Sequence, residues 1–88
     1  MVVSSIIPTK SDGTNTNVRT YNTGVRDEAM KRAAAGKHVV FVDNYTVFTD
    51  NANYKTAWMA DNLHPNEQGY AALGKSFYGV VSAFLPAP

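Results

Sequence analysis

The stretch HVVFVD, residues 38–43, carries the clearest structural signal in the sequence. Its four central residues are apolar without interruption, a pattern typical of a strand that is buried on both faces of a parallel sheet. An earlier β-branched stretch, VVSSII at residues 2–7, predicts a second short strand that Pro8 ends. Two such strands indicate an α/β protein if a helix connects them.

A helix is predicted between these strands, over residues 18–35. Apolar side chains recur there at steps of three and four residues: Val18, Tyr21, Val25, Ala29 and Ala33. Gly36 follows and is expected to end the helix. The polar residues 9–17, TKSDGTNTN, are expected to form a loop, because Asp-Gly and capping-type side chains favour turns. The order predicts a right-handed βαβ unit with parallel strands.

The C-terminal half is predicted to hold a long loop and one helix. Residues 44–62 are expected to be mostly irregular, with a short helix near residues 55–59, and loops of this length usually carry function. The last helix is expected to begin near Pro65, a residue favoured at the first helical position, and to stop before Pro86. Its expected buried stripe consists of Tyr70, Leu73, Phe77, Val80 or Val81, and Phe84.

The length of 88 residues suits one small domain, with the last helix covering one face of the sheet. Two parallel strands make a narrow sheet, however, and a strand as apolar as residues 38–43 normally has neighbours on both edges. The sequence therefore predicts the second half of a larger α/β domain. An open strand edge would favour oligomerisation, because it offers backbone groups to another strand.

Composition excludes several classes of function. The formal net charge is +1 and the Lys and Arg residues are dispersed, which argues against a nucleic-acid or anionic-membrane partner. No apolar run approaches the roughly 20 residues that a membrane span needs, and the first residues lack the charged lead of a secretory signal. There is no cysteine, and His38 and His64 are the only histidines, so neither disulfides nor a metal or other cofactor is expected.

The candidate catalytic residues lie in DNLHPNEQGY, residues 61–70, where Asp61 precedes His64 by three positions. They fall between a strand and a helix, at the carboxyl edge of the predicted sheet, where open α/β folds carry their active sites. The carboxylate could accept a hydrogen bond from one imidazole nitrogen and leave the other free to take a proton from a hydroxyl. Alternatively, Asp61 could cap the helix, with His64 half-buried and chemically idle. The spacing fits both interpretations.

This segment, followed by AALGKSFYGVVSAFL, resembles the last sequence block of the SGNH or GDSL family of serine esterases and lipases. MVVSSIIP and YNTGVRDEAMKRAAAGKHVVFVD likewise resemble the strand, helix and strand that precede that block. The resemblance implies a three-layer, flavodoxin-like α/β fold, of which this chain would be the C-terminal portion. It is most similar to secreted carbohydrate esterases that remove acetyl groups, which implies an acyl ester or acetylated saccharide as substrate and an extracellular location.

The resemblance assigns Asp61 as the acid and His64 as the base of a catalytic triad. The family's nucleophilic serine lies in a Gly-Asp-Ser segment, and its oxyanion hole uses a Gly-x-Asn-Asp segment; this sequence contains neither. We therefore expect residues 1–88 to be a single domain that lacks the N-terminal part with the nucleophile. No glycine-flanked elbow presents another serine, so structural roles are expected for Ser4, Ser5, Ser11, Ser76 and Ser82.

Aromatic residues in the long loop are further candidates for substrate contact. Tyr54 and Trp58 could line an acyl or sugar site, as could Tyr45 and Phe48, although aromatic residues in a small protein more often serve the core. Asp43 follows a strand and could either face the active edge or cap the next turn.

Three functions are therefore compatible with the sequence. The first is a serine esterase in which a second copy or a complementing N-terminal fragment supplies the serine to His64. The second is a catalytically incomplete fragment that oligomerises through its sheet edge. The third is a small carbohydrate-binding module, whose binding would survive His64→Ala and fail on Trp58→Ala.

Overall fold

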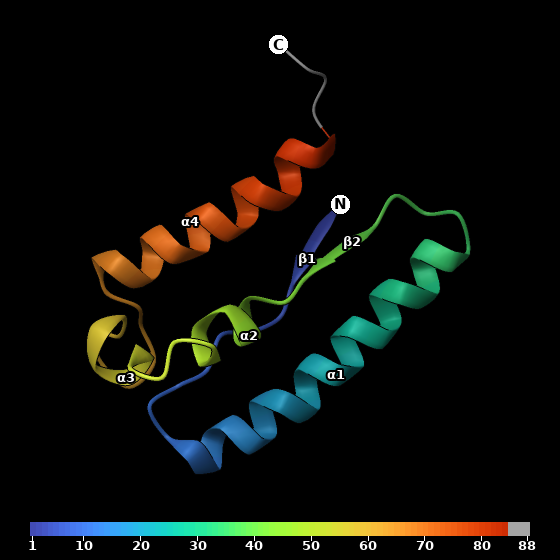
Figure 1. Ribbon diagram of the computed structural model, residues 1–88. Coiled ribbons are helices and arrows are strands. Elements are labelled where there is room, and N and C mark those ends of the chain that lie inside the picture. Colours follow the sequence, from blue (N-terminus) through green and yellow to red (C-terminus); the bar gives the residue numbers. More distant parts are fainter. Residues whose placement is uncertain (85–88) are drawn as a thin grey trace.

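The computed structural model describes residues 1–84 and shows an α/β arrangement (Figure 1). The elements in chain order are β1 (Val2–Ser4), α1 (Asp12–Ala34), β2 (Val40–Val42), α2 (Asn44–Thr49), α3 (Tyr54–Ala57), α4 (Glu67–Val81) and the 3₁₀-helix η1 (Ser82–Phe84). None of the helices within residues 1–84 is long and apolar enough to cross a membrane.

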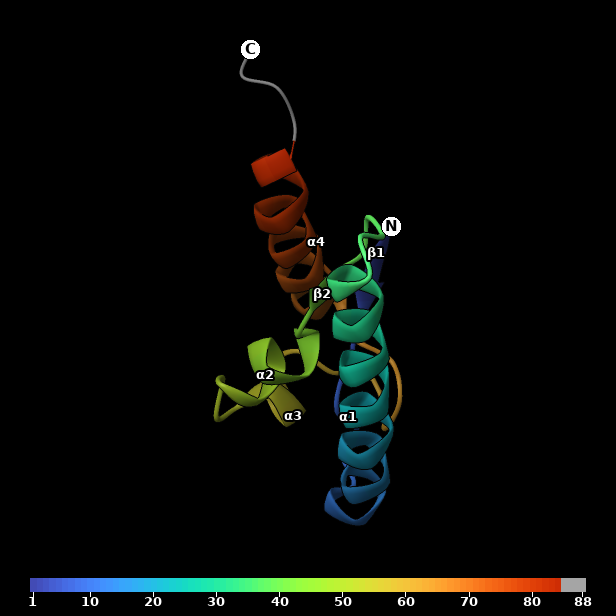
Figure 2. The same ribbon diagram turned by 90° about the vertical axis from the view of Figure 1, so that its right-hand side faces the viewer.

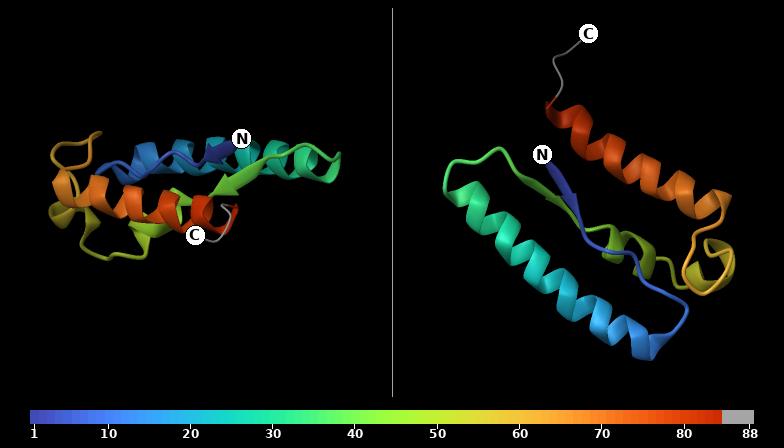
Figure 3. Two further views of the ribbon diagram at one scale, coloured as in Figure 1. Left: turned by 90° about the horizontal axis from the view of Figure 1, so that it is seen from above. Right: turned by 180° about the vertical axis from the view of Figure 1, so that it is seen from behind.

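The two strands pair in parallel, with Val2 opposite Val40 and Ser4 opposite Val42. They run between α1 and α4, which lie on either side of them (Figures 1 and 3). Helices α2 and α3 lie together to one side of α1 (Figure 2). The predicted strand–helix–strand unit with parallel strands is therefore confirmed, although each strand is shorter than the apolar run that predicted it.

Two asparagines of α1 pair with the extended chain that follows β1. Oδ1 of Asn22 accepts from the backbone N–H of Ile6 at 2.7 Å, and its Nδ2 donates to the Ile6 carbonyl at 2.8 Å. Asn15 makes the same pair of contacts with Thr9, at 2.6 and 2.9 Å. Buried backbone groups need partners, and here side-chain amides serve where a neighbouring strand would otherwise do so.

The prediction that residues 9–17 form a loop is wrong, because α1 already begins at Asp12. Ser11 caps the helix, its side chain accepting from the Thr14 N–H at 3.3 Å. The buried positions of α1 are Asn15, Asn22 and Ala29, which recur every seven residues. Apolar periodicity missed the first two of them because they are polar.

The predicted apolar stripe of α1 is only partly confirmed. Val18 and Val25 are half-buried and Ala29 is buried, whereas Tyr21 and Ala33 are exposed. The narrow sheet explains the difference, since it covers only part of the helix surface. The end of the helix is as expected: Gly36 follows with φ +87°, a left-handed conformation that favours glycine.

Residues 44–62 are more helical than the sequence indicated. Helix α2 was not predicted, and α3 covers Tyr54–Ala57 in place of a helix over residues 55–59. Helix α2 starts because Asp43 caps it: its carboxylate accepts from the Thr46 N–H at 3.1 Å and from the Thr46 hydroxyl at 2.7 Å. The capping alternative for Asp43 is therefore confirmed.

The last helix begins later than predicted. Asn66 is its N-cap and Glu67 its first residue, so Pro65 lies ahead of the helix and not at its first position. Helical structure ends at Phe84, ahead of Pro86, which lies outside the described residues. Of the expected stripe, Leu73, Phe77 and Val80 are half-buried, while Tyr70 and Val81 are exposed. The side chain of Phe84 lies outside the described part of the chain.

The apolar core gathers under the short helices and the start of α4. Phe48 is fully buried and packs edge-on against Tyr54 and Trp58, at centroid distances of 6.3 and 5.1 Å. Met59 completes the buried cluster, and Ile7, Val47 and Leu73 pack around it. This core lies directly beside the segment that carries Asp61 and His64.

The pairing between Asn15 and Thr9 predicts a large cost of truncation. Asn15→Ala should lower the free energy of unfolding by about 1 to 3 kcal/mol, because it leaves the buried Thr9 N–H without a partner and removes one of the two hydrogen bonds of the Thr9 carbonyl and of the Tyr54 hydroxyl. Asn17→Ala is the matched control, since Asn17 is exposed on the same helix and should change stability by no more than about 0.5 kcal/mol. Urea denaturation measures both, and equal effects would contradict the structural role of Asn15.

Candidate active site

Asp61 and His64 lie in a tight loop between α3 and α4. The two sides of the loop meet at an antiparallel bridge between Met59 and Pro65, and the Ala60 N–H donates to the His64 carbonyl at 2.8 Å. The loop lies on the side toward which both strands run (Figure 1). It is joined to the chain after β1, because the Lys10 N–H donates to the Asn62 carbonyl at 3.1 Å. The structure thus places both residues at the expected edge.

The Asp61 carboxylate organises this loop. One of its oxygens, Oδ1, accepts from the backbone N–H groups of Leu63 at 2.8 Å and His64 at 2.7 Å. These two hydrogen bonds, that of Leu63 first, are the main reason why the pKa of the Asp61 carboxyl lies below its usual value of 3.8. The imidazole of His64 lowers this pKa further. Asp61 is therefore an anion at neutral pH.

The same carboxylate fixes the imidazole. Nδ1 of His64 lies 3.1 Å from each of the two Asp61 oxygens. An ionised carboxylate can only accept, so the contact requires a proton on Nδ1. In the neutral ring this leaves Nε2 with its lone pair, in the form that a general base needs. The side chains of His64 and Asp61 are 68% and 62% exposed, so Nε2 is accessible to a reactant.

The alternative in which Asp61 caps the last helix and His64 is half-buried is wrong. The cap of α4 belongs to Asn66, whose Oδ1 accepts from the Gly69 N–H at 2.9 Å. The predicted helix start at Pro65 lies one residue ahead of Asn66, so Asn66 was not predicted as the cap. The signal was present, since Asn is among the preferred N-cap residues and the acidic Glu67 follows it.

The serines occupy structural positions. The Ser5 hydroxyl is buried, donates to Asp43 at 3.3 Å and accepts from the Tyr45 N–H at 2.9 Å. Ser4 donates to its neighbour's carbonyl and accepts from Asn44 at 2.7 Å. Ser11 caps α1, Ser82 donates to the Gly79 carbonyl, and Ser76 is half-buried in α4. Within residues 1–84, no serine hydroxyl forms a hydrogen bond with His64.

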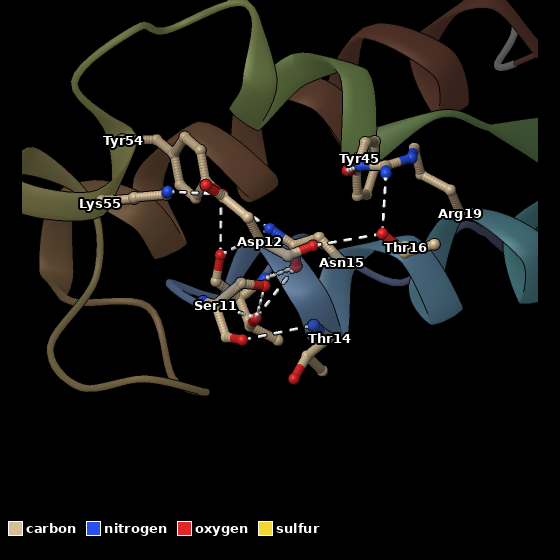
Figure 4. A network of polar contacts seen from close by, with 10 residues as sticks. Ser11, Asp12, Thr14, Asn15, Thr16, Arg19, Tyr45, Tyr54 and Lys55 are labelled. Carbon is tan, nitrogen blue, oxygen red and sulfur yellow. Dashed lines mark hydrogen bonds and ion pairs between the residues drawn. The ribbon is translucent and has the colours of Figure 1, made fainter.

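The aromatic candidates for substrate contact are used in packing. Tyr54 is buried, and its hydroxyl donates to the Thr9 carbonyl at 2.7 Å and accepts from Nδ2 of Asn15 at 3.1 Å (Figure 4). Trp58 is half-buried against Phe48. Substrate binding by Tyr54 and Trp58 stays a prediction.

An ion pair that the sequence did not indicate joins the start of α1 to α3. Nζ of Lys55 lies 2.6 Å from the Asp12 carboxylate (Figure 4). This hydrogen bond raises the pKa of Lys55 and lowers that of Asp12, so both groups stay charged. The partners are 43 positions apart in sequence, too far for a local pattern to reveal.

Among residues 1–84, no three or more His, Asp or Glu side chains gather in a way that could hold a metal ion.

The sequence profile of the GDSL-like lipase/acylhydrolase family matches residues 2–72, a range that includes β1, β2, Asp61 and His64. The chain belongs to this family. It accordingly carries a domain of the esterase or lipase type. Neither the curated proteins nor the solved structures contain a match to the chain.

The hydrogen bonds at Asp61 predict its titration. In the folded chain its pKa should lie below 3.8, and it should remain low in His64→Ala because the backbone N–H groups are the main cause. Because the pKa is lowered, the ionised carboxylate stabilises the loop at pH values above its usual pKa of 3.8. This stabilisation is lost as the pH falls through the lowered pKa. An NMR titration of the Asp61 carboxyl carbon measures this. A midpoint at or above 3.8 in the original chain would contradict the geometry.

Proposed function

We propose that the chain is a carboxylic ester hydrolase of the SGNH/GDSL type, with His64 as the general base and Asp61 as the residue that orients it. One observation carries this proposal: Nδ1 of His64 is held 3.1 Å from both oxygens of an ionised carboxylate, while the rest of the ring is exposed. The family to which the chain belongs supports it, since its members are acylhydrolases by name.

The reaction in this proposal passes through an acyl-enzyme. A serine hydroxyl attacks the ester carbonyl carbon while its proton passes to Nε2 of His64. The tetrahedral intermediate then collapses, the alcohol leaves, and His64 returns the proton to it. Water attacks the acyl-enzyme by the same route and releases the acid. Asp61 stabilises the imidazolium in each half, because its charge faces Nδ1 throughout.

The nucleophile in this proposal is a serine of a second copy of the chain, which takes up a catalytic position only when the two copies assemble. The sheet has two strands, so β1 and β2 each have an outer edge that another strand can join. Assembly through such an edge would widen the sheet toward the three-layer, flavodoxin-like fold that the family resemblance implies. The chain would then correspond to the C-terminal portion of that fold.

Acetylated saccharides are the proposed substrates. The support is the likeness of residues 61–70 to the corresponding segment of carbohydrate acetylesterases, together with the exposure of His64, which admits a bulky alcohol group. An extracellular location follows from the same likeness and belongs to the proposal.

Acetate release from an acetylated xylo-oligosaccharide tests the proposed function. His64→Ala should abolish it, because removing the base of a serine triad costs on the order of a millionfold in turnover. His38→Ala is the matched control: His38 is exposed, distant in sequence from the loop, and should leave the rate unchanged. Release that persists in His64→Ala would contradict the role of His64 as the base, and no release by the original chain would contradict the hydrolase proposal. An equal rate on a long-chain ester would contradict only the acetyl preference.

The alternative is a catalytically incomplete fragment that needs a complementing N-terminal polypeptide. The observation in its favour is that the described serines occupy structural positions. It predicts no His64-dependent hydrolysis by the chain until the second polypeptide is added.

A further inference from the structure

Asn66 joins the two helices between which the loop of Asp61 and His64 lies. Its backbone N–H donates to the Trp58 carbonyl at 2.8 Å, and its Nδ2 donates to the Ala57 carbonyl at 2.9 Å. Its Oδ1 accepts from the Gly69 N–H at 2.9 Å. One residue therefore caps α4 and, at the same time, ties α4 to the last residue of α3.

Gly69 permits this close approach. A Cβ at this position would overlap the Trp58 carbonyl oxygen and would lie 2.8 Å from Cβ of Pro65. Gly69 is also the buried residue of α4. We call Asn66, Gly69 and the carbonyls of Ala57 and Trp58 the α3–α4 clamp.

The clamp closes the base of the loop. Only residues 59–65 lie between Trp58 and Asn66, and the bridge between Met59 and Pro65 continues the contact between the two sides. Asp61 and His64 are mostly exposed, so little side-chain packing holds them. Their relative orientation depends on the backbone of the loop, and that backbone depends on how far apart its ends are kept.

We propose that Asn66 is a positioning residue for His64. By holding the ends of the loop together, its Nδ2 contact with Ala57 keeps Nδ1–H of His64 on the Asp61 carboxylate and Nε2 free to accept a proton. This inference rests on the proposed hydrolase function for its catalytic meaning. The geometric claim can be tested without turnover.

The test separates the tether from the cap by two substitutions. Asn66→Ser keeps a side-chain oxygen for the Gly69 N–H but does not reach Ala57, and Asn66→Asp keeps the cap but has no donor for the Ala57 carbonyl. The ¹⁵N shifts of the neutral His64 ring report its tautomer. The original chain should show mainly Nδ1–H, and its population should fall at least about twofold in both variants.

Two controls accompany these variants. Asn53→Ser changes an N-cap whose side chain makes no capping hydrogen bond, so it should leave the His64 tautomer unchanged. Gly69→Ala should lower the Nδ1–H population as the Asn66 variants do, whereas Gly74→Ala, where an added Cβ meets nothing within 4 Å, should not. If Asn66→Ser fails to fold, Asn66→Asp carries the test, and circular dichroism establishes folding.

A tautomer population that is unchanged in the folded Asn66 variants would overturn the proposal and leave Asn66 as a helix cap only. This outcome differs from failure of the proposed function, because the tautomer is read without any ester. A chain that hydrolyses nothing but shows the expected tautomer changes would refute the hydrolase and keep the positioning role of Asn66.

Discussion

The side chain of Asn15 holds the extended segment after β1 in place by pairing with both backbone groups of Thr9. Its Nδ2 also donates to the Tyr54 hydroxyl, which itself donates to the Thr9 carbonyl. This buried triangle connects α1, the segment after β1 and the apolar core (Figure 4). The next residue, Lys10, then donates its N–H to the carbonyl of Asn62, in the loop that carries Asp61 and His64. The placement of the loop thus depends on a buried amide, since two short strands supply few ladder hydrogen bonds.

The loop itself is ordered by backbone hydrogen bonds to the Asp61 carboxylate. Two backbone N–H groups converge on one oxygen of Asp61, which keeps the carboxylate ionised and directs it toward Nδ1 of His64. Both side chains are nevertheless largely exposed. The pair is therefore organised by its own seven-residue loop and by the clamp beneath it, with little contribution from side-chain packing.

Several features could be predicted because they depend on local signals. The apolar residues 38–43 gave a parallel strand, Gly36 ended the first helix, and the spacing of Asp61 and His64 brought them together. The start of α1 could not be predicted in this way. Asn15, in the stretch that was predicted as a loop, is a poor helix former that favours turns, and what overrides this preference is its pairing with both backbone groups of Thr9.

The exposed apolar residues have a related explanation. Tyr21 and Tyr70 match the apolar stripes of their helices in sequence, but their side chains are exposed. Apolar periodicity indicates which face of a helix can be buried, but not how much of that face a neighbouring element covers. The nucleophile of the proposed site could not be predicted, because no sequence pattern in the chain marks the serine that would meet His64.

The most direct test of the central claim, that His64 activates a serine, is intact-mass analysis after treatment with a fluorophosphonate. This probe labels an activated serine, whereas an activated ester can be cleaved by a bare imidazole. We expect one adduct on the original chain, retained in His38→Ala and lost in His64→Ala, and peptide mapping then names the serine. No adduct on the original chain would contradict the claim.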